Sequence, residues 1–120
     1  MKILALDSCM NTSSVALLED EKLISLYTVN TNNTHSETLL PMIKRVMQDV
    51  AFDCLDAIAV TVGPGSFTGI RIGVATAKGI AFAHNTPCIA VSTLEAIAYN
   101  FVDKDAVICA VMDARRMQFY

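Results

Sequence analysis

The sequence predicts an α/β fold in which a mixed β-sheet is flanked by helices. Apolar runs follow one another at the start of the chain, and later apolar runs alternate with segments of helical period. This succession is typical of a layered α/β domain. A chain of 120 residues is the size of one domain. Its 53% hydrophobic and only 18% charged residues indicate extensive burial or a surface for a partner.

The first half of the chain predicts a β-meander followed by a helix. Strand-like runs separated by short polar turns cover residues 2–8 (KILALDS), 14–20 (SVALLED) and 22–30 (KLISLYTVN). After a polar connector, residues 36–50 carry apolar side chains at helical spacing. Thr34 and Glu37 have the spacing of a capping box at its start. Pro41 lies inside this segment and predicts a kink or an early end of the helix.

The second half predicts strands and helices in alternation. The continuous apolar run at residues 55–63 (LDAIAVTVG) is typical of a parallel strand covered on both faces. A glycine-rich turn follows it and leads into a helix over residues 68–84. The remaining expected elements are a buried strand at 87–93, a short helix at 94–102 and a strand at 106–114.

Charge and composition exclude several classes of protein. The net charge of -3 provides no basic field for strong nucleic-acid binding. No apolar stretch approaches the roughly 20 residues of a membrane span, and the start of the chain lacks a signal-peptide pattern. Widely spaced cysteines without a CxxC motif disfavour zinc and predict reduced thiols in the core: Cys9, Cys54, Cys88 and Cys109. We therefore expect a cytoplasmic protein without membrane contact.

The glycine-rich stretch TVGPGSFTGIRIG, residues 61–73, poses the question of a nucleotide site. A P-loop needs GxxxxGK[ST], and no lysine stands at the required place. A dinucleotide-binding turn needs GxGxxG, but one residue too many separates Gly65 from Gly69. Pro64 fixes its own φ, and Gly63 and Gly65 permit backbone conformations closed to other residues. We therefore expect these three to form a structural turn from strand into helix.

The helix expected at 68–84 is apolar nearly all round, with Arg71 and Lys78 as its formal charges. Such a helix is buried on more than one side. Gly69 and Gly73 lie on one face, and small residues in a row let a second helix approach closely. We therefore expect this helix to contribute to a protein interface, with packing inside the chain as the alternative.

Polar residues elsewhere give weaker indications. Asp7 and Ser8 end the first strand and could form a vestigial nucleotide site, but no glycine opens this turn. Capping of the turn by Asp7 is therefore the favoured alternative. His35 has Leu39 four residues later instead of a second metal ligand, and His84 lies at a helix end. No nucleophile–base–acid set emerges, so no catalytic or metal-binding residue is assigned.

Four segments carry a family resemblance: ILALDS…SSVAL, HSETLLPMI, VTVGPGSFTGIRIGVATAKGIA and MDARR. Together they resemble the bacterial TsaB (YeaZ) family over essentially the whole chain. The GPGSFTGIRIG run is specific, and HSE with LLP supports it independently. The resemblance implies an actin-like ATPase (ASKHA, ribonuclease H-like) domain, with residues 1–120 as its N-terminal lobe and the family's second lobe absent from this chain.

The resemblance also implies that the chain has a non-catalytic function. Members of this family are the non-catalytic partner in threonylcarbamoyladenosine modification of tRNA. The chain would form a homodimer and would pair with the catalytic subunit TsaD. TsaE would join that assembly, and tRNA would be met only through the complex. No cofactor is implied for this chain, because ATP and metal belong to TsaD, whose relatives carry an HxxxH motif where this chain offers only His35.

The two helices at 36–50 and 68–84 supply the residues that the resemblance places at the homodimer or TsaD interface. They are Leu39, Met42, Ile43, Val46, Gly69, Arg71, Gly73, Val74, Ala75 and Lys78. The apolar members would supply contact area, and Arg71 and Lys78 would set the register or pair with acids of the partner. Two other classes stay open. One is a glycoprotease-like or nucleotide-dependent hydrolase that uses Asp7 and the glycine loop; the other is a self-associating structural module that ignores TsaD.

Overall fold

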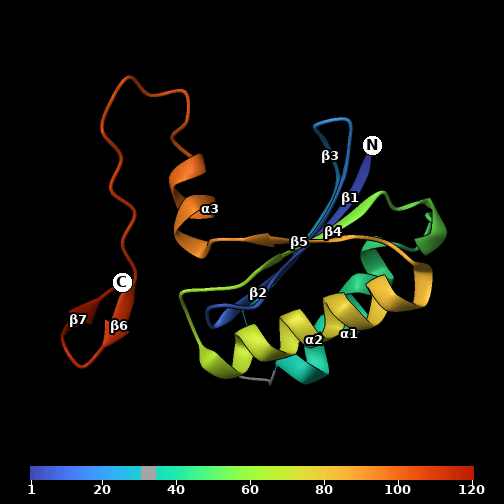
Figure 1. Ribbon diagram of the computed structural model, residues 1–120, viewed down its shortest axis with the longest axis horizontal. Helices are drawn as coiled ribbons and strands as arrows, with labels where there is room; N and C mark the ends of the chain where they lie inside the picture. Colours follow the sequence, from blue (N-terminus) through green and yellow to red (C-terminus); the bar gives the residue numbers. More distant parts are fainter. Residues whose placement is uncertain (31–34) are drawn as a thin grey trace.

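The computed structural model describes residues 1–30 and 35–120 and contains a five-stranded sheet with two helices packed on one face (Figure 1). The elements in chain order are β1 Lys2–Asp7, β2 Thr12–Glu19, β3 Lys22–Asn30, α1 His35–Val46, η1 Phe52–Cys54, β4 Ala57–Thr61, α2 Phe67–His84, β5 Cys88–Val91, α3 Thr93–Tyr99, β6 Asp113–Arg115 and β7 Gln118–Phe119. The predicted α/β class with a mixed, helix-flanked sheet is confirmed.

Strand β1 lies at the centre of the sheet, whose strand order is β3-β2-β1-β4-β5. β1 pairs antiparallel with β2, and β2 pairs antiparallel with β3, which confirms the predicted meander. On its other side β1 pairs parallel with β4, which pairs parallel with β5. β1 therefore has an antiparallel neighbour on one side and a parallel neighbour on the other. Because β1 and β4 are parallel, their carboxyl ends lie next to each other.

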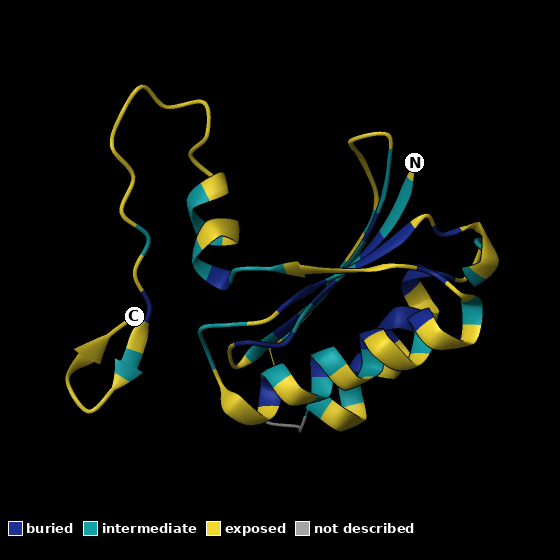
Figure 2. Cartoon of the chain, in the orientation of Figure 1, coloured by how far each residue is buried: buried dark blue, intermediate teal, exposed yellow. Residues whose placement is uncertain are grey.

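The strand register directs one apolar row of each inner strand to the same face. Because alternate residues of a strand share a face, the pairings align six core side chains. They are Leu4, Leu6, Val15, Leu17, Ile58 and Val60. Helices α1 and α2 cover this face, and Figure 2 shows their buried sides turned towards it. The core therefore lies between the sheet and these two helices. Full burial of each such side chain contributes roughly 1.5–3 kcal/mol to stability.

Strands β4 and β5 differ in burial, although the sequence predicts both as buried parallel strands. β4 is buried along almost its whole length, as expected for an inner strand. In β5, Cys88, Ile89 and Ala90 are exposed. β5 is an edge strand, and α3 lies beyond its end in Figure 1 instead of over it. The prediction of a buried strand at 87–93 is therefore wrong in its burial.

The predicted strand at 106–114 is wrong over most of its length. Only β6 forms there, and it pairs with β7 in a separate two-stranded sheet. Residues 107–111 are irregular, and Val107 is fully exposed. An apolar run forms a strand only where another strand satisfies its backbone groups, and the structure places none beside residues 107–111 among those it describes.

Helix α2 begins and ends within one residue of its predicted bounds. The hydroxyl of Ser66 caps its start by accepting from the backbone N–H of Gly69 over 3.3 Å. Asn85, with a left-handed φ of 51°, ends it.

Helix α1 is shorter than predicted and ends at Val46. It continues through Pro41, so the early boundary expected at that residue is wrong. Thr34 of the expected capping box lies outside the described residues.

The cysteines do not share one environment. Cys9 is buried at the end of β1, as predicted for a core thiol. Cys54, Cys88 and Cys109 are exposed, so the prediction is wrong for these three, which lie on a short turn, an edge strand and the irregular C-terminal segment. All four are free thiols. None of the helices in the described part of the chain is long and apolar enough to cross a membrane.

Candidate protein-interaction surface

The glycine turn between β4 and α2 packs tightly against the end of β1. Gly63 and Gly65 have φ values of +112° and +155°, which L side chains rarely adopt, and the Gly63–Pro64 peptide is cis. A Cβ on Gly65 would lie 2.4 Å from the carbonyl oxygen of Cys9, so only glycine fits there. The backbone N–H of Ser66 donates to the same carbonyl over 2.7 Å. The turn therefore needs glycine because the chain after β1 lies against it.

This turn does not fit a phosphate cradle. Phosphate sites at helix N-termini present unpaired backbone N–H groups to the anion. Here the N–H of Ser66 binds the Cys9 carbonyl, and the N–H of Gly69 binds the Ser66 hydroxyl. The Cys9 carbonyl oxygen also occupies the space beside Gly65, where its partial negative charge repels an anion. These contacts disfavour a bound phosphate beside Gly65 and Ser66.

Asp7, a residue of the expected vestigial nucleotide site, stabilises its own turn. Its Oδ1 accepts from the backbone N–H of Cys9 (3.1 Å) and from the hydroxyl of Thr61 (2.6 Å). The Cys9 thiol in turn donates to the same hydroxyl oxygen over 3.0 Å. Ser8 is buried, and its hydroxyl donates to the carbonyl of Gly69 over 2.8 Å. These contacts tie β1 to β4 and to α2, and the bond to the N–H two residues on is that of an Asx turn.

Each histidine has a partner that is far away in the sequence. Ser13 Oγ lies 2.6 Å from Nδ1 of His35, which joins the first residue of α1 to β2. Because Ser13 is 2% exposed, it cannot reach a substrate as a nucleophile. Nδ1 of His84 lies 2.5 Å from Asp53 Oδ1, and its ring stacks on Phe52. Within residues 1–30 and 35–120, no three His, Cys, Asp or Glu side chains gather closely enough to hold a metal ion.

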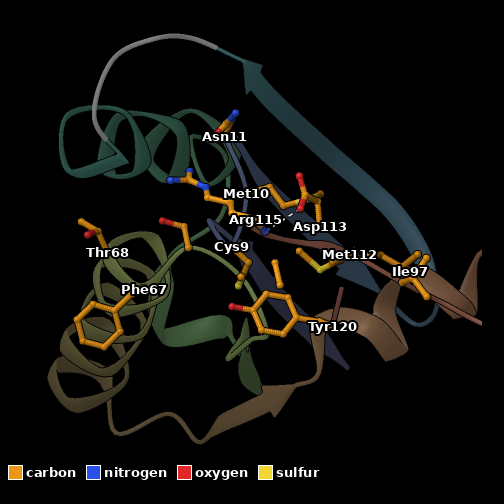
Figure 3. Close-up of a pocket in the computed structure, with 14 residues that line it drawn as sticks. Cys9, Met10, Asn11, Phe67, Thr68, Ile97, Met112, Asp113, Arg115 and Tyr120 are labelled. Atoms are coloured by element: carbon orange, nitrogen blue, oxygen red, sulfur yellow. Dashed lines mark hydrogen bonds between the residues drawn. The ribbon is translucent and has the colours of Figure 1, made fainter. Parts of the chain in front are cut away.

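An open cavity of about 730 Å³ lies beside the glycine turn (Figure 3). Its walls come from the turn after β1, the start of α2 and the C-terminal segment. Cys9 and Met10 come from the turn after β1, and Arg115 and Tyr120 come from the C-terminal segment. Asp7 and Ser8 are not part of its lining. The two residues expected at a nucleotide site therefore do not face this cavity.

Gly69 and Gly73 face the sheet, so the expectation that they face a partner helix is wrong. A Cβ on Gly69 would lie 2.0 Å from the backbone carbonyl oxygen of Ser8, and one on Gly73 would lie 2.4 Å from the Ser8 hydroxyl. Ala77 and Ala81 continue the row, and all four residues are buried. Gly69 and Gly73 leave room for the end of β1, which lies against the start of α2.

The predicted interface residues of α1 also require correction. Leu39, Met42, Ile43 and Val46 are only 1–4% exposed and belong to the core. They fill the space between α1 and the sheet, so their apolar surface is not available to a partner. Leu40, at 51%, is instead a large apolar side chain of α1 that is exposed.

The outward face of α2 carries five exposed residues, which we call the outer stripe. They are Phe67, Arg71, Ala75, Lys78 and Phe82. At 3.6 residues per turn they fall within an arc of about 80°. Phe67 is 73% exposed and Phe82 is 91% exposed. Figure 2 shows this outward side of the helix layer as largely exposed. Large aromatic side chains left in water on an otherwise packed helix are typical of a protein-interaction surface.

The sequence identified part of this stripe and missed its two aromatic members. Arg71, Ala75 and Lys78 were expected at an interface and do lie at the surface. Val74, also expected there, is half-buried and packs against the core. Phe67 and Phe82 were not predicted. A helical projection that took Gly69 as the inward direction would have placed both on the opposite side.

These features define a class of protein. A mixed sheet in the order β3-β2-β1-β4-β5, with α1 and α2 on one face, has the ribonuclease H-like fold of the actin-like ATPase class. The structure of RuvC from Thermus thermophilus shares this fold alone, at 15% identity and a TM-score of 0.57 over 79% of this chain and 66% of that chain.

Closer relatives identify the family. The family described as "TsaD: tRNA N6-adenosine threonylcarbamoyltransferase" matches residues 29–120. The Bacillus subtilis protein named "tRNA threonylcarbamoyladenosine biosynthesis protein TsaB" is 39% identical over 122 residues, which cover 100% of this chain and 53% of the relative. The structure of YeaZ from Pseudomonas aeruginosa is 34% identical with a TM-score of 0.88, over 98% of this chain and 57% of that chain. The chain therefore belongs to the TsaB (YeaZ) family and spans about half the length of these relatives.

Proposed function

We propose that this chain is a non-catalytic scaffold subunit of the bacterial tRNA threonylcarbamoyladenosine modification complex, in the cytoplasm. It pairs with the catalytic subunit TsaD through the outward faces of α1 and α2. The observation that carries this proposal is the exposure of Phe67 and Phe82, at 73% and 91%, on a helix whose other face is already packed. The similarity to TsaB proteins along the whole chain supports the pathway.

The same surface serves self-association in the absence of TsaD. A homodimer and the TsaD pair are therefore alternative states, because one helix layer cannot contact both partners at once. TsaE joins the TsaD assembly, and tRNA is met through the complex. ATP and metal belong to TsaD, and this chain contributes position and contact area.

Candidate catalytic groups are enclosed or already hydrogen-bonded within the chain, which supports a non-catalytic role. A hydrolase would need an accessible nucleophile, whereas the Ser13 hydroxyl beside His35 is enclosed. A nucleotide-dependent enzyme would need free N–H groups at the glycine turn and the start of α2, where the N–H groups of Ser66 and Gly69 are already bonded within the chain. ATP turnover by the purified chain that disappears on Asp7→Ala would favour the hydrolase alternative.

Co-purification with TsaD tests the proposal. Phe82→Asp places a charge at the most exposed aromatic residue of the outer stripe. Truncation or charge at an interface anchor costs about 2 kcal/mol or more, so pairing with TsaD should weaken by about 30-fold or more. Val107→Asp is the matched control, because Val107 is also almost wholly exposed, at 101% against 91% for Phe82, and lies outside the helix layer. Unchanged self-association and unchanged TsaD pairing for Phe82→Asp would contradict the proposed surface.

A further inference from the structure

Both cations of α2 lie on the outer stripe, and no acidic residue accompanies them. Within its bounds, Phe67–His84, α2 contains Arg71 and Lys78 and neither Asp nor Glu. Helices α1 and α2 together contain four Lys or Arg and one Glu, whereas the rest of the chain contains five Lys or Arg and eleven Asp or Glu. The helix layer is therefore positive on a chain that is negative overall.

The arrangement along the stripe is nearly symmetric about its middle. An aromatic residue stands at each end, and the cations lie between them, seven residues and so about 10 Å apart along the helix. Ala75 separates the cations and offers little side chain of its own. The guanidinium of Arg71 lies 5.2 Å from the ring centroid of Phe67, so this cation is held on the stripe.

A second copy of the chain does not fit this charge pattern. Two copies related by a two-fold axis and packed antiparallel along the whole stripe bring Phe67 opposite Phe82 of the second copy. The same alignment brings Arg71 opposite Lys78 of the second copy. A parallel pair places each cation opposite its own counterpart, so cation faces cation in both arrangements. Sliding one helix by a turn separates the charges but leaves one phenylalanine beyond the overlap.

Acidic groups elsewhere on the helix layer do not balance these cations. Glu37 is the one acid of α1 and α2, and it lies in the first turn of α1. Lys44 and Arg45 in the last turn of α1 add further positive charge, with Arg45 placed 4.8 Å from the Tyr27 ring. Like charges opposed across an interface suppress pairing, and carboxylates at the same places favour it.

We propose that the outer stripe selects its partner by charge. Its preferred partner is a different protein that presents carboxylates to Arg71 and Lys78 and apolar surface to Phe67 and Phe82. A second copy binds the stripe less tightly because its cations repel. This inference rests on the proposed function for the location of the surface and adds the chemistry by which the two pairings are distinguished.

Charge reversal tests the self-pairing directly by analytical ultracentrifugation. In the antiparallel pair, which brings Phe67 opposite Phe82, Arg71→Glu or Lys78→Glu alone sets an introduced carboxylate against the remaining cation of the second copy, twice in each dimer. Each single variant should therefore self-associate about tenfold or more tightly than wild type, and high salt should diminish the gain. The double variant opposes carboxylate to carboxylate and should return to the weak association of wild type. Single variants no tighter than wild type, or a double variant tighter than both, would overturn the proposal.

Pairing with the TsaD protein of the same organism provides the second arm. Each single reversal should weaken that pairing about fivefold or more, and the double reversal should weaken it further. Lys104→Glu, an exposed cation outside the helix layer, should change neither arm. If Phe82→Asp disrupts TsaD pairing and the charge reversals do not, charge selection is wrong and the proposed function stands. If Phe82→Asp has no effect on TsaD pairing, the proposed function fails, and the self-association arm still decides the question of charge.

Discussion

The two faces of α2 differ in the size of their side chains, and the physical reason for that size differs as well. The inner row consists of the small residues Gly69, Gly73, Ala77 and Ala81, all of them buried. At the two glycines the chain itself leaves no room, because the carbonyl and hydroxyl of Ser8 lie where a side chain would be. The outer stripe carries large aromatic and charged side chains that contact little within the chain. Small residues on a helix are therefore not by themselves evidence of an external partner. Here the evidence lies on the opposite face, where bulky apolar groups remain in water.

The largest expected effect comes from adding one methyl group to the inner row. In Gly69→Ala the new Cβ meets a backbone oxygen at 2.0 Å, which cannot turn away as a side chain can. Overpacking of this kind costs about 3 kcal/mol or more, and better helix propensity offsets about 1 kcal/mol of it. We expect urea unfolding to show a net loss of about 2 kcal/mol or more. A variant as stable as wild type would show that α2 is not pressed against β1.

A smaller effect with a change of sign is expected at Gly73. The group in the way of Gly73→Ala is the hydroxyl of Ser8, 2.4 Å from the new Cβ, which also donates to the Gly69 carbonyl. Displacing it should cost about 1–3 kcal/mol, and better helix propensity offsets roughly 0.5–1 kcal/mol of this, so a small net loss of stability is expected. In a Ser8→Ala background the obstacle is gone, so Gly73→Ala should instead stabilise the protein by roughly 0.5–1 kcal/mol. A double-mutant cycle measured by chemical unfolding checks this, and additive effects would contradict the contact.

The sequence was sufficient for the fold where local pattern and global packing agree. The β-meander, the inner strand β4 and the bounds of α2 all follow from periodicity and turn residues. The apolar run at 106–114 has an equally clear strand pattern, but no strand lies beside most of it in the described structure. The prediction that β5 is buried is wrong for a related reason. An apolar pattern cannot reveal which face of a sheet a helix will cover.

The candidate surface could be predicted only in part. Apolar periodicity located the two helices but not their inward direction, so core residues such as Met42 and inward glycines such as Gly73 were assigned to the interface. The direction is set by the approach of Ser8 to α2, a contact between residues 61 positions apart in the case of Gly69. Ser13 and His35 show the same limit, since strand pairing and helix packing bring them together.

The smallest expected effect in stability is at Gly79, which provides the matched control for Gly69. A Cβ there has nothing within 4 Å, because the residue lies on the exposed side of α2 next to the outer stripe. In the isolated chain Gly79→Ala should therefore stabilise the fold by roughly 0.5–1 kcal/mol through helix propensity alone. The same methyl group should weaken pairing with a partner helix if that helix packs closely beside Lys78 and Phe82. Thermal unfolding of the chain and titration with TsaD separate the two effects. Destabilisation of the isolated chain would mean that the outward face of α2 is covered from within, and the contrast between its two faces would then fail.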